Sequence, residues 1–133
     1  MKRLFLMLGL ILAALPVFAE TPEAVLAALK SEASAMPGFQ DFSAARGEAF
    51  FKEKHGGEWS CASCHTENPA SEGKHAKTGK IIKPLAPSAN AERFTDMAKV
   101  AKWFKRNCND VLERVCTPQE KGDVLAYLLT VKR

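Results

Sequence analysis

Apolar residues recur along most of this chain at helical spacing, and no run of alternating β-branched residues predicts a strand. The first helical segment starts at Thr21, the predicted N-cap, and ends before Pro37. A second helical segment starts at Ser43, and the Gly56-Gly57 pair is expected to stop it. The pattern thus predicts two short helices in the first half of the chain.

A long polar segment separates these helices from the helical patterns of the second half. Residues 67–91 are rich in glycine, proline and lysine, which predicts a loop. A loop of this length in a small domain usually has a function or encloses a ligand. Helical spacing resumes at Met97, and the last helix has a capping box made by Thr117 and Glu120. The sequence therefore predicts an all-α domain of four or five short helices.

The first 19 residues have the pattern of a secretory signal peptide. A short basic start is followed by an almost wholly apolar run from Leu4 to Val17, and small residues precede a predicted cut after Ala19. The apolar run is short for a transmembrane span, so an uncleaved N-terminal anchor is the weaker alternative. We expect residues 1–19 to be a signal peptide, and residues 20–133 to form one periplasmic domain without a membrane span.

Cleavage would leave 114 of the 133 residues and lower the formal net charge from +4 to +2, because Lys2 and Arg3 would be removed. A charge this close to zero gives no reason to expect a nucleic acid partner. Export would place four cysteines in an oxidising compartment. These are Cys61, Cys64, Cys108 and Cys116.

The five residues from Cys61 to His65 form a C-x-x-C-H run, which is the attachment pattern of a c-type haem. The thiols of Cys61 and Cys64 would bond to the two haem vinyl groups as thioethers, and His65 would ligate the iron from the proximal side. The sequence therefore predicts one covalently bound haem c. The Pro84-Leu85 segment is a candidate to lie on the proximal side and to orient His65 through a backbone carbonyl.

Three other uses of this motif stay open. A redox-active dithiol normally follows a strand, and none is predicted here. A zinc site would need four ligands, for example Cys61, Cys64, His65 and His75, but adjacent residues rarely share one tetrahedral ion. A direct disulfide between Cys61 and Cys64 would close a very tight loop.

The sixth position of the iron has no obvious ligand. Electron-transfer cytochromes c commonly use methionine there. Met97 is the only methionine after the haem motif, and its helical spacing with apolar neighbours favours a place in the core. His55 and His75 lie in polar segments, where a histidine is more often solvated than ligating.

The helices that flank the motif resemble those of class I cytochromes c. In that class a glycine and an aromatic residue let the first and last helices cross closely, and Gly47 and Tyr127 stand at the corresponding places. Ordinary packing of these two residues is the alternative. The resemblance implies a class I cytochrome c-like bundle around the haem.

The remaining cysteines, Cys108 and Cys116, are left to form a disulfide once the other two hold haem. The segment from Trp103 to Cys108, followed by the segment from Cys116 to Asp123, resembles the sphaeroides haem protein family and its relative cytochrome c″. In that family the residue before the first cysteine is the sixth ligand of the oxidised iron. It is asparagine in sphaeroides haem proteins and histidine in cytochrome c″, and here it is Asn107.

The resemblance implies that Asn107 leaves the iron on reduction and that oxygen, nitric oxide or carbon monoxide then binds. It also implies electron supply by a dihaem c-type cytochrome or another periplasmic donor. The loop lysines are candidates to meet haem propionates or an acidic partner, and a solvated loop is the favoured alternative for any single lysine. The alternative is a plain electron carrier with a permanently six-coordinate haem. No catalytic residue is assigned, and turnover of a small ligand at an open iron stays possible.

Overall fold

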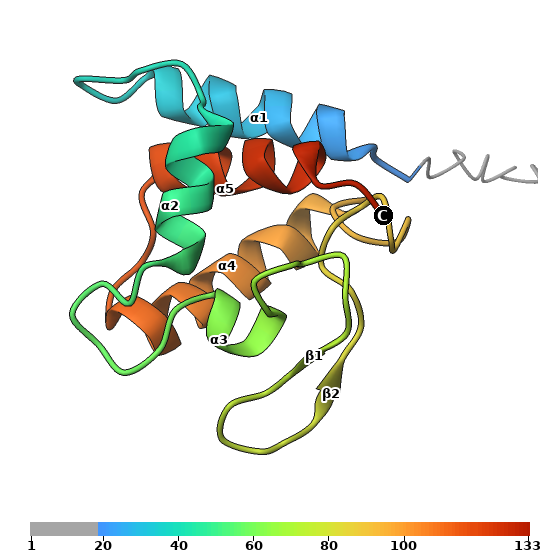
Figure 1. Ribbon diagram of the computed structural model, residues 1–133. Coiled ribbons are helices and arrows are strands. Elements are labelled where there is room, and N and C mark those ends of the chain that lie inside the picture. Colours follow the sequence, from blue (N-terminus) through green and yellow to red (C-terminus); the bar gives the residue numbers. More distant parts are fainter. Residues whose placement is uncertain (1–18) are drawn as a thin grey trace, which may run out of the picture.

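The computed structural model describes residues 19–133, so the predicted signal peptide lies outside the described residues except for its last one. Within this range the fold is helical apart from one very small hairpin, which agrees with the predicted all-α class (Figure 1). The elements in chain order are α1 (Pro22–Ser34), α2 (Ala44–Lys52), α3 (Ala62–His65), β1 (Gly73–Lys74), β2 (Ile81–Ile82), α4 (Met97–Leu112) and α5 (Pro118–Thr130).

The helices begin where the sequence predicts. The hydroxyl oxygen of Thr21 accepts a hydrogen bond from the Ala24 amide at 3.1 Å. Ser43 caps α2 in the same way. Thr117 and Glu120 form the complete capping box of α5, with reciprocal bonds of 3.2 and 2.8 Å. These local side-chain bonds satisfy backbone amides that have no partner inside the helix.

Helix α2 is shorter than predicted. It ends at Lys52, before the Gly56-Gly57 pair, because Glu53 already has an extended backbone. His55 then lies 2.8 Å from the Phe50 carbonyl oxygen through its Nε2 atom, and its ring packs on the Phe50 ring. The contacts of His55 with Phe50 therefore stabilise the chain where it leaves the C-terminal end of α2.

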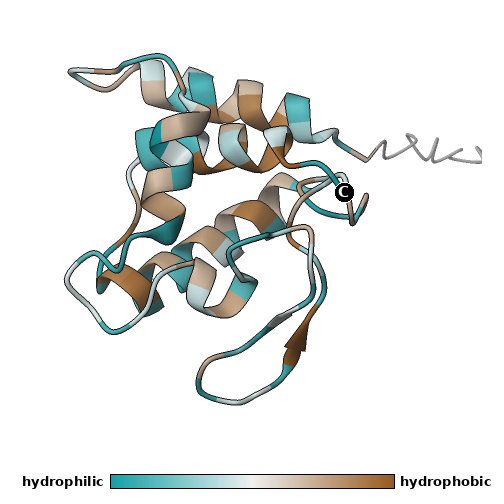
Figure 2. Cartoon of the chain, in the orientation of Figure 1, coloured by the Kyte–Doolittle hydropathy of each residue, from teal (hydrophilic) through white to brown (hydrophobic). Residues whose placement is uncertain are grey.

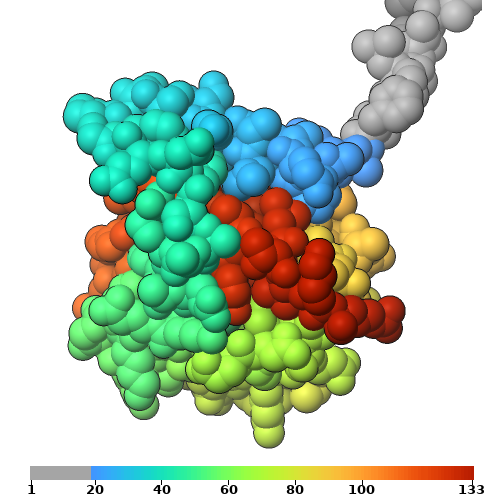
Figure 3. Space-filling view, turned by 45° about the horizontal axis from the view of Figure 1, so that its top comes forward, coloured from blue at the N-terminus to red at the C-terminus, as the bar shows by residue number. Residues whose placement is uncertain are grey.

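Helix α5 is the centre of the fold. It lies between α1 and the region of α2 and α3, as the ribbon and space-filling views both show (Figures 1 and 3). The buried residues Val25 and Leu29 of α1 pack with Leu125 of α5. On its other side α5 places Tyr127 and Leu128 against Phe51 of α2. These two clusters form the apolar core.

Helices α2 and α5 cross at Gly47. A Cβ atom at this position would collide with the backbone carbonyl of Asp123 and lie 3.0 Å from the Cβ of Tyr127. Phe51, one turn further along α2, packs on Tyr127 with ring centroids 5.6 Å apart. The glycine and the aromatic residue proposed from the sequence therefore do meet at a helix crossing.

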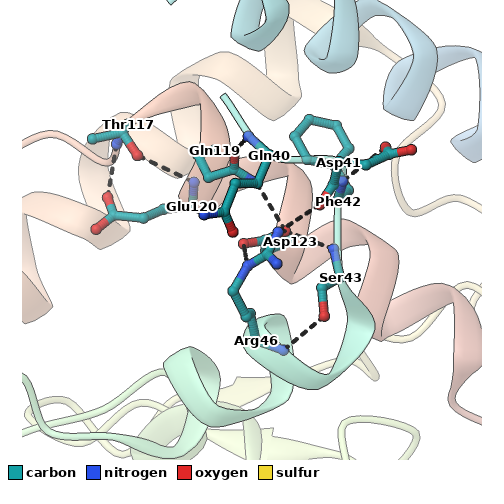
Figure 4. Close-up of polar contacts among 9 residues, drawn as sticks. All are labelled: Gln40, Asp41, Phe42, Ser43, Arg46, Thr117, Gln119, Glu120 and Asp123. Atoms are coloured by element: carbon teal, nitrogen blue, oxygen red, sulfur yellow. Dashed lines mark hydrogen bonds and ion pairs between the residues drawn. The ribbon is translucent and has the colours of Figure 1, made fainter. Parts of the chain in front are cut away.

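A buried carboxylate stabilises the same crossing (Figure 4). Asp123 accepts hydrogen bonds from the Ser43 amide at 2.7 Å, from Arg46 at 2.9 and 3.0 Å, and from Gln119 at 3.1 Å. Its side chain is only 7% exposed, so these four donors replace the water that the carboxylate would otherwise bind. The start of α2 is thus bonded directly to α5.

The predicted loop of residues 67–91 contains the one sheet found in the described part of the chain. Gly73 pairs with Ile82, and Lys74 with Ile81, in an antiparallel hairpin. β2 is an apolar segment at the edge of the fold (Figure 2), and Ile81 is 60% exposed. None of the helices in residues 19–133 is long and apolar enough to cross a membrane.

Gly47→Ala should destabilise the fold. Helix propensity alone predicts that alanine stabilises α2 by about 1 kcal/mol. The collision with the Asp123 carbonyl forces the helices apart, and overpacking of this kind costs about 2 kcal/mol or more. Chemical denaturation of the haem-loaded protein measures the difference. A variant as stable as the wild type, or more stable, would show that the crossing is not tight.

Candidate haem site

The C-x-x-C-H motif forms a single helical turn. The His65 amide donates to the Cys61 carbonyl at 3.0 Å, which closes the turn. Ser60 and Ser63 support it by reciprocal bonds, in which each backbone amide donates to the other's hydroxyl at 2.9 and 3.2 Å. Cys61 and Cys64 are both half-buried and both free, so they do not form a disulfide with each other. The turn presents two cysteines and a histidine from one short segment.

The β1–β2 hairpin holds this turn from one side. A Cβ atom on Gly73 would collide with the Cys64 carbonyl and lie 3.1 Å from the His65 Cα. The Ala76 amide donates to the Cys64 sulfur at 3.3 Å. Sequence reasoning missed this contact, although a glycine in a polar segment is a signal for close backbone approach. The hairpin therefore fixes the backbone from which Cys64 and His65 project.

The surroundings of His65 favour the protonation state of a metal ligand. Burial, and secondly the charge of Arg93, lower the pKa of His65 to about 4, so the imidazole is neutral at physiological pH. Neutral imidazole is the form that binds a metal. Residues 19–133 provide no hydrogen bond to either ring nitrogen, and the Phe51 ring lies 6.4 Å away. No hydrogen bond joins His65 to the Pro84-Leu85 segment within residues 19–133, and the Pro84 carbonyl accepts from Asn90 and Arg93.

The structure disfavours the alternatives to haem. Burial raises the pKa of Cys61 to about 11, so this thiol stays protonated, unlike the reactive thiolate of a redox dithiol. No group of three or more possible metal-binding side chains of histidine, cysteine or acidic type occurs within residues 19–133. His75 in particular accepts hydrogen bonds from the amides of Lys77 and Thr78 inside the hairpin turn.

Helix α4 carries the predicted sixth ligand. Asn107 is exposed and shares a helix face with Phe104, three residues before it, and Val111, four residues after it. Phe104 packs against the cluster that contains Ala62 of the haem-binding turn. Asn107 therefore lies one turn beyond Phe104, which packs against this cluster, and directly before Cys108.

The two remaining cysteines form a disulfide. Cys108 and Cys116 are buried and joined, with Cα atoms 5.6 Å apart. The bond connects the last part of α4 to the residue before the Thr117 cap of α5. The backbone next to Asn107 is thus tied to the central helix of the fold.

Met97 and His55, the other candidates for the sixth iron ligand, make contacts of their own. Met97 packs with the core cluster of α1 and α5, as its spacing predicted. His55 is engaged by Phe50 at the end of α2.

Taken together, these residues fit a c-type haem. The motif offers two cysteines outside any disulfide and a neutral histidine without a hydrogen-bond partner in the described part of the chain. Ala62 of the turn belongs to an apolar cluster, which suits a porphyrin. Phe51 is a member of this cluster, and Leu85, Phe94 and Phe104 pack against it.

Comparison with known proteins decides the family. Residues 37–128 match the model of a domain of unknown function, DUF1924. Cytochrome c″ of Methylophilus methylotrophus is 50% identical over 101 residues, which cover 73% of this chain and 70% of the relative. The cytochrome c-type protein SHP of Cereibacter sphaeroides is 44% identical over 128 residues, covering 93% and 95%. The chain belongs to the SHP and cytochrome c″ family.

Solved structures agree with this assignment. Oxidised cytochrome c″ from Methylophilus methylotrophus superposes with a TM-score of 0.73 at 44% identity, over 84% of this chain and 95% of that one. Oxidised SHP, described as an oxygen-binding cytochrome c, also gives 0.73, at 42% identity over 83% and 96%. The protein is thus a haem cytochrome, and the predicted resemblance is confirmed.

Gly73→Ala should disturb haem attachment. The added Cβ meets the Cys64 carbonyl, so the haem-binding turn must shift, and the strain should cost about 1–3 kcal/mol. We expect less covalently bound haem per protein after co-expression with the cytochrome c maturation machinery. Haem-stained gels and intact mass measure it.

Gly79→Ala is the matched control in the same hairpin. Gly79 has a positive φ but contacts only the flexible end of Lys74, so alanine there costs about 1 kcal/mol without moving the turn. Equal haem content in the two variants would contradict a specific role of Gly73.

Proposed function

We propose that this cytochrome carries one haem, attached through Cys61 and Cys64 and ligated by His65, in the periplasm. Asn107 fills the sixth position in the oxidised state and leaves it on reduction, so that a small diatomic gas can bind. The observation that carries the proposal is the place of Asn107 on α4, beside Phe104 and immediately before the disulfide cysteine. SHP, a close relative in sequence, is described as oxygen-binding.

The side chain of Asn107 is free to serve as a ligand. It is exposed, and residues 19–133 provide it with no side-chain hydrogen bond. Its amide oxygen is a neutral and hard donor, which ferric iron accepts better than the softer ferrous iron does. When bound, the haem supplies an iron that changes oxidation state and takes up a gas at an open position. Because an amide does not titrate, release of Asn107 follows the iron charge and not the pH.

The surroundings of Asn107 limit how it can move. Val100 and Phe104 anchor the first part of α4 in the core, and the Cys108–Cys116 bond anchors its last part. Rotation of the Asn107 side chain, without unwinding of the helix, is therefore the expected movement. A side chain that rotates on a fixed backbone stays close and can return on oxidation.

The alternative, a carrier with permanent six-coordination, needs another sixth ligand. Met97 is packed in the core and His55 closes α2, as described above. His75 accepts two backbone hydrogen bonds within the hairpin turn. Each of the three would have to abandon a local role, which favours Asn107.

Asn107→Ala should change only the oxidised spectrum. The variant lacks a sixth ligand in the ferric state, so its ferric spectrum should become more high-spin, while its reduced spectrum and carbon monoxide response match the wild type. Asn109→Ala, two residues further on the outer face of α4, is the control and should leave both spectra unchanged. A reduced wild-type protein that is low-spin and indifferent to carbon monoxide would contradict gas binding.

An electron donor is the second part of the proposal. The outer face of α4 carries Lys102, Lys105 and Arg106, none of which forms an ion pair with residues 19–133. They line a shallow groove with Asn109 and the exposed Val115. A cationic face with an apolar part suits an acidic face on a dihaem c-type cytochrome or another periplasmic donor. The same helix would thus bear the donor surface and Asn107.

Charge reversal should slow reduction by such a donor. In stopped-flow mixing with a reduced dihaem cytochrome from the same organism, the variant K102E/K105E/R106E should react about tenfold more slowly at low salt. High salt should remove the difference, because it screens the charges. The variant K74E/K80E/K83E changes the net charge equally on the hairpin. An equal loss of rate in both variants would contradict docking on α4.

A further inference from the structure

The β1–β2 hairpin has a basic tip, residues 74–83, that projects from the helical part of the fold (Figure 1). It carries four exposed lysines, and residues 73–91 contain no acidic residue. None of the four forms an ion pair with a side chain of residues 19–133. They are Lys74, Lys77, Lys80 and Lys83. The hairpin tip is therefore a positive surface whose charge the described part of the chain does not neutralise.

The outward face of the hairpin also has an apolar centre. Gly73 pairs with Ile82 and lies against the haem-binding turn, whereas Lys74 pairs with Ile81 on the opposite face of the two strands. Ile81 is 60% exposed, and Lys80 precedes it directly in the chain. A large apolar side chain thus projects into solvent among lysines.

Trp59 lies next to this tip. The Nζ atom of Lys77 is 4.7 Å from the centre of the Trp59 ring, which is half-buried. Tryptophan and lysine are both typical of the headgroup layer of a membrane, where the ring and the lysine stem contact apolar groups and the ammonium group reaches the phosphates. The residue types at the tip are therefore those of a membrane-surface site.

Protection of the sheet edge does not account for Ile81. Lysines at an edge strand prevent pairing with other chains, and a polar residue at position 81 would serve that purpose better than an exposed isoleucine. The combination of a cationic rim and an apolar centre instead suits a partner that is both anionic and apolar beneath its surface.

The small size of the tip favours a lipid surface over a protein partner. A standard protein interface uses about 20 to 30 residues on each side. Long mobile lysines also lose side-chain entropy when a protein partner holds each of them in one geometry. A membrane surface makes neither demand, because it attracts each lysine separately and lets the side chain keep moving.

We propose that the hairpin tip binds reversibly to an anionic phospholipid surface, with its lysines at the headgroup phosphates and Ile81 in the layer beneath them. The inference rests on the export proposed above, which brings the protein to a membrane surface, and not on the role of Asn107. The tip belongs to other elements than the cationic groove of α4, so the donor surface stays available. Binding should weaken as salt screens the charges.

The experiment is co-sedimentation of the haem-loaded protein, residues 20–133, with sucrose-loaded vesicles. One set of vesicles contains equal parts of phosphatidylethanolamine and phosphatidylglycerol, and the other contains phosphatidylcholine alone. Haem absorbance in the pellet measures the bound protein. At low salt we expect the wild type to sediment with the anionic vesicles and to stay in solution with the neutral ones.

Two variants separate the charged and the apolar contributions. K74Q/K80Q/K83Q should bind the anionic vesicles about a hundredfold more weakly, because each lysine near such a surface contributes about 1 kcal/mol. Ile81→Ser keeps the charge and should bind about tenfold more weakly, because it removes the apolar side chain. All four positions are exposed, so both variants should keep the haem content and the unfolding temperature of the wild type.

The variant K102Q/K105Q/R106Q is the matched control. It removes the same charge from the outer face of α4 and should bind the anionic vesicles as the wild type does. Equal losses in the two triple variants would indicate general charge attraction and overturn the proposal. Wild-type protein that stays in solution with anionic vesicles at low salt would also overturn it, and so would undiminished binding of Ile81→Ser.

A protein partner at the tip would give a different result. The variant K74Q/K80Q/K83Q would then bind vesicles like the wild type and be reduced more slowly by a donor cytochrome, which would reject the lipid surface. Gas binding takes no part in the vesicle assay. A wild-type protein without a carbon monoxide response would therefore contradict the function proposed above and leave this test valid.

Discussion

Helices α2 and α5 meet at Gly47 with no side chain between their backbones, and the position of the haem-binding turn depends on this contact. The crossing brings Phe51 onto Tyr127 and places its ring 6.4 Å from that of His65. The four hydrogen bonds of buried Asp123 hold the start of α2 in the same register. A wider crossing would withdraw Phe51 and expose His65, which would then no longer be held neutral by burial.

The proposed ligands belong to two parts of the fold with different mechanical properties. His65 projects from a turn that is closed by its own hydrogen bonds and held by the close approach of Gly73. Asn107 projects from the exposed flank of α4, which is anchored at both ends by the core and the disulfide but is free at that side chain. In this arrangement the His65 side of the iron stays fixed while the Asn107 side chain can move. Asn107 can then leave the iron and return without a change of the backbone.

Local sequence signals predicted much of the fold. Thr21, Ser43 and Thr117 act within one helical turn, so their caps can be read from the sequence. The hairpin was missed because its strands have two residues each, and its register depends on tertiary packing of Gly73 on Cys64.

In the proposed function, Asn107 is an iron ligand only in the oxidised protein. Crystal structures of the haem-loaded protein, oxidised and then reduced in the crystal without oxygen, test it most directly. We expect the Asn107 amide oxygen to be bonded to iron in the first structure and turned away in the second, with Cys108–Cys116 intact and α4 unchanged. Asn107 bonded in both states, or a histidine or methionine in its place, would contradict it.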